Sequence, residues 1–199
     1  MSEGFVSVGC RTTIPIFAKK RCQAEVCDMD DHRHTQHDRP VLVPDTNVWL
    51  DLLCFRDRTV EPLRLLAMSG ALRLVINSRT RDEWRRVLGY PQLALDADRQ
   101  QRLLDEYAGM ATSFEATSLP AGAFDGSVLP RCKDPDDQMF LELARACGAE
   151  ALLTRDNALL MLDRRCRRVA GFAVLPPTTW LRGKLERPDS GSRAIDAGI

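Results

Sequence analysis

Three aspartates stand where a strand-like segment gives way to a helix-like one. Asp45 directly follows the apolar run 41–43, and Asp156 follows the apolar run 151–154 in the same way. Asp137 stands at the start of a strong helical pattern. In an open α/β sheet the carboxyl ends of the strands share one edge, so loops from distant parts of the chain converge there. We therefore expect these three side chains to form one acidic cluster.

An acidic cluster of this kind suits metal chemistry. Carboxylates in one crevice repel each other unless a cation offsets their charge, and hard oxygen ligands suit Mg²⁺ or Mn²⁺. A second interpretation stays open, because aspartate is also a good N-cap and each of the three stands at an expected helix start. Position and spacing alone do not decide between metal ligands and helix caps.

The elements that must position these residues follow from the apolar pattern. Short apolar runs bounded by Gly, Pro or Asp predict buried strands, and apolar residues three and four apart predict helices. The expected strands are 41–43, 72–76, 151–154 and 173–175, with a weaker candidate at 113–117. The expected helices are 46–55, 62–69, 78–88, 97–110, 137–147 and 157–163. Residues 118–133 are expected to be mostly loop, and the arginine-rich run 164–168 is a candidate basic patch, with a solvated loop as the alternative.

Strands that alternate with helices predict a parallel sheet covered on both faces, so the expected fold is a three-layer α/β/α sandwich. This domain should span residues 40–182, followed by a polar C-terminal tail, 183–199. Residues 1–39 lack a helical or strand period and are expected to be a loose tail or the product of a misassigned start. The three histidines of the chain, at 32, 34 and 37, and the cysteines at 10, 22 and 27 lie there, but their spacing is not that of a paired zinc motif.

Composition excludes several functions. The 199 residues carry 28 Lys plus Arg and 28 Asp plus Glu, which excludes a strongly basic nucleic-acid binder but not a local basic patch. No apolar run approaches the roughly 18 residues of a membrane span. The seven cysteines are scattered without a Cys-x-x-Cys pair, which is typical of reduced thiols in the cytoplasm.

Four segments together resemble the PIN-domain nucleases. Residues 41–50 (VLVPDTNVWL) resemble the opening strand and Asp-Thr-Asn of that family, and residues 82–88 (DEWRRVL) its second acidic motif. Residues 134–144 (DPDDQMFLELA) are similar to its third motif, and residues 153–160 (LTRDNALL) to its Thr-x-Asp fourth. The order and approximate spacing agree from residue 40 to 181, and the branch most similar is that of toxins from toxin–antitoxin systems.

The resemblance implies a metal-dependent ribonuclease. It places Asp45, Glu83, Asp137 and Asp156 in a catalytic site that binds Mg²⁺ or Mn²⁺, and hydrolysis there leaves a 5′-phosphate and a 3′-hydroxyl. Asn47, Asp134 and Thr154 are expected to support these carboxylates, whereas Asp136 is expected to be solvated. Glu83 has an alternative interpretation as an ordinary exposed helix residue.

Single-stranded RNA is the implied substrate, and a small antitoxin protein and a homo-oligomer are the implied partners. Arg79, Arg86 and Arg155 are the expected phosphate contacts, with a solvated basic face as the alternative. Three tryptophans are candidates for base stacking, although a core position is favoured for the first and third: Trp49, Trp84 and Trp180.

Two other classes of protein remain as alternatives. A phosphotransfer or dehalogenase-like enzyme also carries an aspartate after its first strand, but it normally needs a dedicated lysine or a second aspartate two residues later, where this chain has Asn47. A catalytically silent PIN-like module that binds RNA or a protein is the other alternative. The four acidic residues at the expected positions count against it, and metal-dependent cleavage distinguishes the two.

Overall fold

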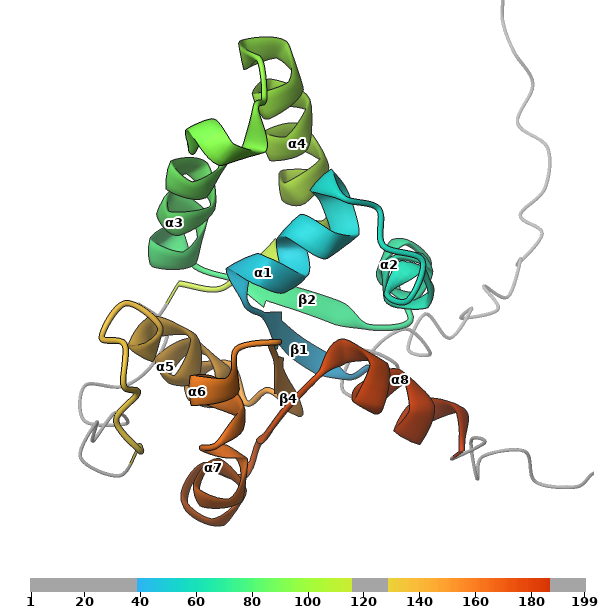
Figure 1. Cartoon of the computed structure of the whole chain (residues 1–199). Helices are drawn as coiled ribbons and strands as arrows, with labels where there is room; N and C mark the ends of the chain where they lie inside the picture. Colours follow the sequence, from blue (N-terminus) through green and yellow to red (C-terminus); the bar gives the residue numbers. More distant parts are fainter. Residues whose placement is uncertain (1–38, 116–128, 187–199) are drawn as a thin grey trace, which may run out of the picture. The chain divides into compact units, whose positions relative to one another are not determined.

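A five-stranded parallel sheet forms the centre of the domain (Figure 1). The computed structural model describes residues 39–115 and 129–186. The strand order is β3-β2-β1-β4-β5, and each neighbouring pair is parallel. The strands are β1 (Val41–Pro44), β2 (Arg73–Ile76), β3 (Ala111–Ser113), β4 (Ala151–Leu153) and β5 (Ala173–Leu175). The expected parallel sheet is confirmed, and its first strand lies at the centre.

Helices cover both faces of this sheet, as expected for a three-layer sandwich. They are α1 (Thr46–Trp49), η1 (Leu50–Cys54), α2 (Glu61–Met68), α3 (Ser78–Leu88), η2 (Pro91–Leu93), α4 (Ala97–Met110), α5 (Gln138–Ala146), α6 (Asn157–Leu160), α7 (Asp163–Ala170) and α8 (Pro177–Leu185). Figure 1 shows α1 to α4 on one side of the sheet and α5 to α7 on the other.

Alternate residues of each strand face the two layers. On β1, Leu42 packs in a core with buried residues of α1, η1, α3, α4 and α8, whereas Val43 packs in a second core with residues of α5, α6 and α7. On β4, Leu153 joins the first core and Leu152 the second. The sheet is therefore buried on both faces, which explains why its strands read as continuous apolar runs in the sequence.

Three aromatic side chains stack inside the first core. The rings of Trp49 and Tyr107 meet edge to face with centroids 4.5 Å apart, and Trp84 stacks on Tyr107 at 5.4 Å. All three are at most 2% exposed. Trp180 is also buried and donates a hydrogen bond from Nε1 to Glu150 at 2.8 Å. The core position favoured for Trp49 and Trp180 is therefore confirmed, and the interpretation of Trp84 as a base-stacking residue is wrong.

Several elements differ from their expected bounds. The weak strand candidate at 113–117 lies earlier, at β3, directly after α4 and without a turn between them. The expected helix 157–163 ends at Leu160, and the arginine-rich segment 164–168 belongs to a second helix, α7. Helix α8 was not expected, and it runs past the boundary at 182. Residues 1–38 of the expected tail, which hold the histidines and cysteines without a zinc-motif spacing, and most of the expected loop 118–133 lie outside the described residues.

Within the described ranges, no helix is both long enough and apolar enough to cross a membrane.

Candidate functional site

Asp45 lies at the carboxyl end of the central strand β1. Its backbone N–H donates to Leu153 O of the neighbouring strand β4 at 2.9 Å, so the ends of the two strands are in register. Its side chain is only 5% exposed. Oδ2 accepts hydrogen bonds from Thr154 Oγ1 at 2.6 Å and from Asn47 Nδ2 at 2.7 Å, and Oδ1 accepts from the Asn47 backbone N–H at 3.4 Å. Asp45 is thus a helix cap and a member of a polar site at once.

Two opposing influences act on this carboxyl group. Burial raises the pKa of Asp45, because a charge loses its hydration there, and the hydrogen bond from Thr154 lowers it by stabilising the charged form. Asn47 and Thr154, both predicted as supporting residues, are the groups that hold the Asp45 carboxylate in place.

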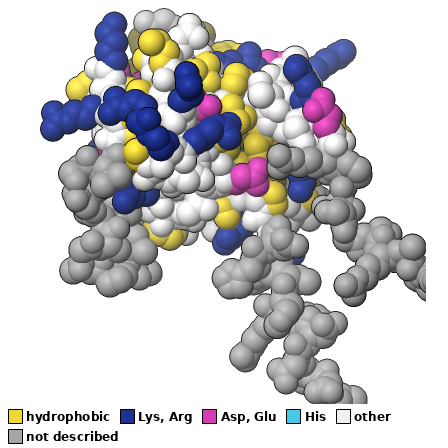
Figure 2. All heavy atoms as spheres, turned by 90° about the horizontal axis from the view of Figure 1, so that it is seen from below, with side chains coloured by type: hydrophobic (Ala, Val, Ile, Leu, Met, Phe, Trp, Pro, Cys, Tyr) yellow, Lys and Arg dark blue, Asp and Glu magenta, His cyan; other side chains and the backbone are white. Residues whose placement is uncertain are grey.

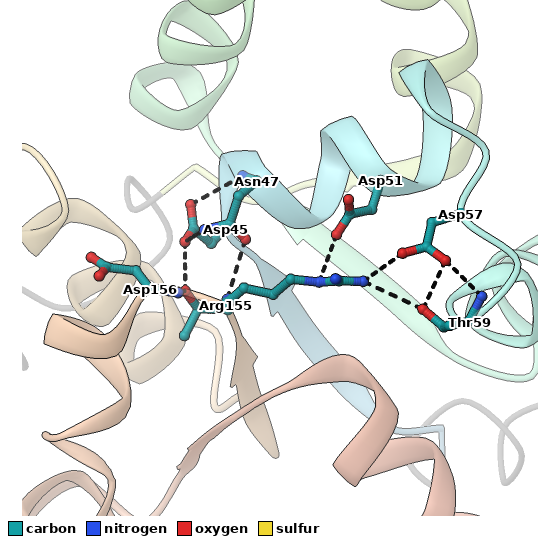
Figure 3. A network of polar contacts seen from close by, with 8 residues as sticks. Asp45, Asn47, Asp51, Asp57, Thr59, Arg155 and Asp156 are labelled. Carbon is teal, nitrogen blue, oxygen red and sulfur yellow. Dashed lines mark hydrogen bonds and ion pairs between the residues drawn. The ribbon is translucent and has the colours of Figure 1, made fainter.

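Thr154 also connects the first strand to Asp156. Its Oγ1 accepts a hydrogen bond from the Asp156 backbone N–H at 2.9 Å while donating to Asp45. The Asp156 carboxylate caps α6 by accepting from the Ala158 N–H at 2.9 Å. Figure 3 shows the side chain of Asp156 directed away from that of its neighbour Arg155. The Thr-x-Asp motif therefore places its hydroxyl and its carboxylate on the same polar site.

Asp137 precedes α5 and is half-buried. Burial, chiefly, raises its pKa to about 7. The negative charges of Asp45 and Asp134 raise this pKa further, as do the hydrogen bond with Asp156 and the charge of that residue. Asp45, Asp137 and Asp156 therefore lie close enough for their charges to interact, and the structure brings together three of the four predicted acids.

Glu83, the fourth predicted acid, lies on α3. It faces a hollow of about 440 Å³ between α3 and the start of α5, lined also by Arg79, Arg86, Pro135 and Asp136. Its Oε2 accepts hydrogen bonds from Arg86 Nε at 2.9 Å and Arg86 Nη2 at 2.5 Å. The structure thus gives Glu83 an arginine partner rather than a carboxylate neighbour.

Asp134 and Asp136, the other two acidic residues of this segment, have smaller roles in the arrangement. Asp134 accepts a hydrogen bond from the Asp136 N–H at 2.9 Å and contributes negative charge to Asp137. The Asp136 side chain is 74% exposed, as expected, and lies 3.7 Å from Arg86 Nη2.

Each arginine predicted to bind phosphate is paired with a carboxylate. Arg79 Nη1 lies 2.7 Å from Glu142 on α5, and Arg86 is held by Glu83. Arg155 lies 2.8 Å from Asp51 and 2.8 Å from Asp57. These three guanidinium groups are therefore occupied by protein carboxylates.

Asp51, Asp57 and Thr59 complete a network that sequence reasoning missed (Figure 3). The Arg155 backbone N–H donates to Asn47 Oδ1 at 3.3 Å, and Arg155 Nη2 approaches Thr59 Oγ1 at 3.4 Å. Asn47 therefore joins the Asp45 carboxylate to the Arg155 network. Asp51 lies in the π-helical turn η1, and no sequence signal marks that turn or the loop that follows it.

The charges of this network follow from burial and pairing. Burial raises the pKa of Asp51, and the adjacent Arg155 guanidinium opposes that shift. Hydrogen bonds from Thr59 and Arg155 hold the pKa of Asp57 below its usual value. One arginine thus offsets two carboxylates beside the acidic cluster.

The donor chemistry of the cluster fits a divalent cation. In residues 39–115 and 129–186, no three His, Cys, Asp or Glu side chains are gathered tightly enough to hold a metal ion by themselves. The available donors are nevertheless carboxylate oxygens, which suit Mg²⁺ and Mn²⁺. Burial is the main cause of the raised pKa of Asp137, and the negative charges of Asp45, Asp134 and Asp156, which add to it, are charges that such an ion would offset.

Comparison with known proteins places the chain in a family. Two solved structures are similar in fold: VapBC2 from Rickettsia felis, bound to a DNA fragment from its promoter, and the RRP44 PIN domain of T. brucei. The first is 14% identical, with a TM-score of 0.45, covering 67% of this chain and 96% of the other. The second is 12% identical, with a TM-score of 0.40, covering 75% of this chain and 83% of the other. No curated protein matches the chain.

The sequence profile of the PIN domain matches residues 41–158. This range is more than half of the chain and runs from the first residue of β1 into α6. It contains all four predicted acidic residues together with Asn47 and Thr154. The chain therefore belongs to the PIN-domain nuclease family.

Proposed function

We propose that this protein is a Mg²⁺- or Mn²⁺-dependent endoribonuclease that hydrolyses phosphodiester bonds of single-stranded RNA. The observation that carries the proposal is the electrostatic coupling of Asp45, Asp137 and Asp156 in a PIN-domain chain. Three mutually repelling carboxyl groups at the carboxyl edge of a parallel sheet are costly without a cation, and a phosphodiester substrate needs positive charge in the same place.

The residues have distinct roles in the proposed site. Asp45 and Asp137 are the main ligands of the divalent cation, and Glu83 and Asp156 complete its coordination. When bound, such a cation would supply Lewis acidity for the scissile phosphate and for a water molecule. Thr154 and Asn47 fix the Asp45 carboxylate by hydrogen bonds, which maintains its orientation and its negative charge. Asp134 acts through Asp137 by adding negative charge.

Exposed arginines of α7 offer charge for the RNA backbone. Arg164, Arg165, Arg167 and Arg168 are exposed on this helix, whereas Cys166 faces the core. Arg167 is paired with Asp163 at 2.9 Å. Figure 2 shows Lys and Arg side chains gathered on one part of the face seen from below. Such a surface favours contacts with phosphates rather than with bases.

The proposed biological setting is a toxin–antitoxin pair, which rests on the sequence resemblance described above. In that setting the partner is a small antitoxin protein, and the chain acts in the cytoplasm, as a homo-oligomer or alone. Expression of this chain alone should arrest growth, and coexpression of a small adjacent open reading frame should relieve the arrest. Unaffected growth would contradict the toxin role without contradicting the nuclease.

Cleavage of a labelled single-stranded RNA tests the enzymatic proposal. Cleavage should require Mg²⁺ or Mn²⁺, stop in EDTA, and leave 5′-phosphate and 3′-hydroxyl ends. Asp45→Asn should abolish it, while Asp136→Asn, which changes an exposed carboxylate in the same segment as Asp137, should be nearly silent. Metal-independent cleavage, or full activity of Asp45→Asn, would refute the mechanism. RNA binding without cleavage would favour the silent binding module.

A further inference from the structure

Arg86 occupies one of the two carboxylate oxygens of Glu83, and a metal ion that binds this oxygen must displace Arg86. Two guanidinium nitrogens, Nε and Nη2, donate to the same oxygen, Glu83 Oε2. Arg86 lies one turn further along α3, so the pair is an i, i+3 contact of the helix surface. A divalent cation that takes this oxygen as a ligand, alone or together with Oε1, must displace Arg86, because the two positive charges repel each other.

The burial of the pair makes this exchange feasible. The Glu83 side chain is 18% exposed, whereas the Arg86 side chain is 53% exposed. Ion pairs in which one partner is well solvated are weak, because water compensates the loss of either charge. A divalent cation carries twice the charge of a guanidinium, and in the proposed site it would also be held by Asp45 and Asp137. It therefore displaces Arg86 at little cost.

The structure also provides a place for the displaced guanidinium. Glu83 and Arg86 line the hollow of about 440 Å³ between α3 and the start of α5. Arg86 Nη2 already reaches across it, to 3.7 Å from Asp136 Oδ2 on the segment that leads to Asp137. The guanidinium fork matches two oxygens of a phosphate. A freed Arg86 thus stays in this hollow, next to the segment that carries Asp137.

We propose that Arg86 is an exchangeable counter-ion: it neutralises Glu83 in the metal-free protein, gives up Glu83 to the divalent cation, and then binds an RNA phosphate. This inference rests on the proposed function, because it takes Glu83 to be a metal ligand. It predicts that metal and RNA bind cooperatively, since the metal releases the residue that the RNA uses.

Neighbouring arginines do not share this position. Arg85, the adjacent residue, lies 3.5 Å from Asp82, and both side chains are well exposed. Arg79 is paired with Glu142, which is not a candidate ligand. Arg85→Gln therefore removes the same charge from the same turn of the same helix without touching Glu83, and it is the matched control.

The first experiment measures Mn²⁺ alone, by electron paramagnetic resonance titration of the full chain without RNA. Arg86→Gln should bind Mn²⁺ about two- to fivefold more tightly than the wild type, because Glu83 is no longer occupied by a competitor. Arg85→Gln should bind it with nearly wild-type affinity. Arg86→Lys, which keeps the charge but loses the fork, should lie between. Equal Mn²⁺ affinities of Arg86→Gln and Arg85→Gln would overturn the proposal.

The second experiment measures RNA binding by fluorescence anisotropy, with Ca²⁺ as a hard cation for the same oxygen ligands. The labelled RNA is checked afterwards for integrity. In Ca²⁺, Arg86→Gln should bind RNA about three- to tenfold more weakly than Arg85→Gln, because one charge-assisted phosphate contact is lost. In EDTA the two variants should be equal, because Arg86 is then held by Glu83. A loss of RNA affinity that is the same with and without Ca²⁺ would overturn the exchange.

The two experiments separate this inference from the proposed function. Absence of Mn²⁺ binding to the wild type, with RNA intact in the presence of Mn²⁺, overturns both. Metal-dependent cleavage by a wild type whose Arg86→Gln and Arg85→Gln variants behave alike overturns only the exchange. The exchange is supported if Arg86→Gln binds Mn²⁺ more tightly and, in Ca²⁺, binds RNA more weakly. A general loss of folding would not produce these opposite changes.

Discussion

Thr154 joins two carboxylate residues through a single hydroxyl group. Its Oγ1 donates to Asp45 and accepts from the Asp156 backbone N–H, and the side chain is fully buried. Thr154→Val keeps the shape but removes both hydrogen bonds, leaving a buried carboxylate oxygen and a backbone N–H without this partner. We expect the free energy of unfolding to fall by about 1–3 kcal/mol and cleavage to fall about 10- to 100-fold.

Urea denaturation and initial cleavage rates measure these effects. Thr154→Ser keeps the hydroxyl and is the matched control, with cleavage close to that of the wild type. A valine variant as active as the serine variant would show that the Asp45 carboxylate does not need this hydrogen bond.

The raised pKa of Asp137 predicts that the stability of the metal-free protein depends on pH. Its pKa is 3.8 in the unfolded chain and about 7 in the folded domain. Between these values the folded state holds a proton that the unfolded state has lost, so stability decreases as pH rises through this window. Asp137→Asn lacks the repelled charge. It should therefore unfold at a higher temperature than the wild type at pH 8, and at a similar temperature at pH 4.

The size of that gain is limited by solvent. The full shift corresponds to about 4 kcal/mol, and screening around this half-buried group reduces the effect to about 1–2 kcal/mol. For a chain of this size we expect a rise in Tm of roughly 2–8 °C at pH 8. Thermal melts in EDTA measure it, with Asp136→Asn as the control. An equal rise for both variants would show that the charge of Asp137 is not specifically strained.

The candidate site was partly predictable at the level of single residues. Asp45, Asp137 and Asp156 follow strands or begin helices, which is information that the local sequence carries. The arginine pairings were not predictable, because they join helices and loops whose relative placement depends on the tertiary fold. The Arg155 network shows this limit: its partners lie 98 and 96 residues away in the chain, at Asp57 and Thr59.

The proposed role of helix α7, contact with RNA phosphates, depends on its exposed arginines. The contacts of α7 with the second core are the buried Cys166 and the partly buried Ala170, so the sequence shows mainly charges, and the helix could not be recognised from periodicity. Helix α8 begins within two consecutive prolines, which are normally turn signals but are also compatible with the first helical positions. By contrast, α4 and β5 have their expected bounds, because turn-forming or capping residues precede them and their apolar patterns are regular.

We predict that α7 contributes to RNA affinity through phosphate contacts. Arg164 and Arg168 are four residues apart and share one face of the helix. The double variant Arg164→Gln/Arg168→Gln should weaken RNA binding severalfold and reduce the slope of log K against log salt by about 1.4, the value for two contacts with single-stranded RNA. Fluorescence anisotropy at several salt concentrations measures both quantities.

A charge-matched control distinguishes a local effect of α7 on RNA affinity from an effect of the net charge. Arg58→Gln/Arg102→Gln removes two exposed arginines from the η1–α2 connection and α4. This variant should change the salt slope by much less. If the two double variants lower RNA affinity equally, the effect comes from overall charge and α7 is not an RNA contact.

At the scale of the whole domain, the strand order determines which residues meet at the carboxyl edge of the sheet, where Asp45 lies. Alternation of strands and helices predicted a parallel sheet, but it does not say which strands are neighbours. The structure sets β1 between β2 and β4, so Asp45 lies at the middle of the carboxyl edge and beside Thr154. Long-range register, here Leu42 with Leu74 on one side and Ala151 on the other, is a property of packing that no local pattern contains.

The first 38 residues are predicted to be dispensable for folding and cleavage. They show neither a helical nor a strand period, and the PIN-domain match begins at residue 41. A shortened chain that begins at Arg39 keeps the contacts of the first strand: Pro40 O accepts from the Arg73 N–H at 2.9 Å, and Val41 O accepts from the Glu150 N–H at 2.8 Å. Its Tm and cleavage rate should equal those of the full chain.

A chain shortened by three further residues, beginning at Leu42, is the matched comparison. It loses Pro40 and Val41, and therefore both of those hydrogen bonds to β2 and to the residue before β4. Two lost backbone hydrogen bonds cost about 1–3 kcal/mol, so the Tm of this chain should fall by several degrees. Thermal melts and cleavage rates of the three chains test the boundary. A large loss of Tm already in the chain that begins at Arg39 would show that residues 1–38 stabilise the folded domain.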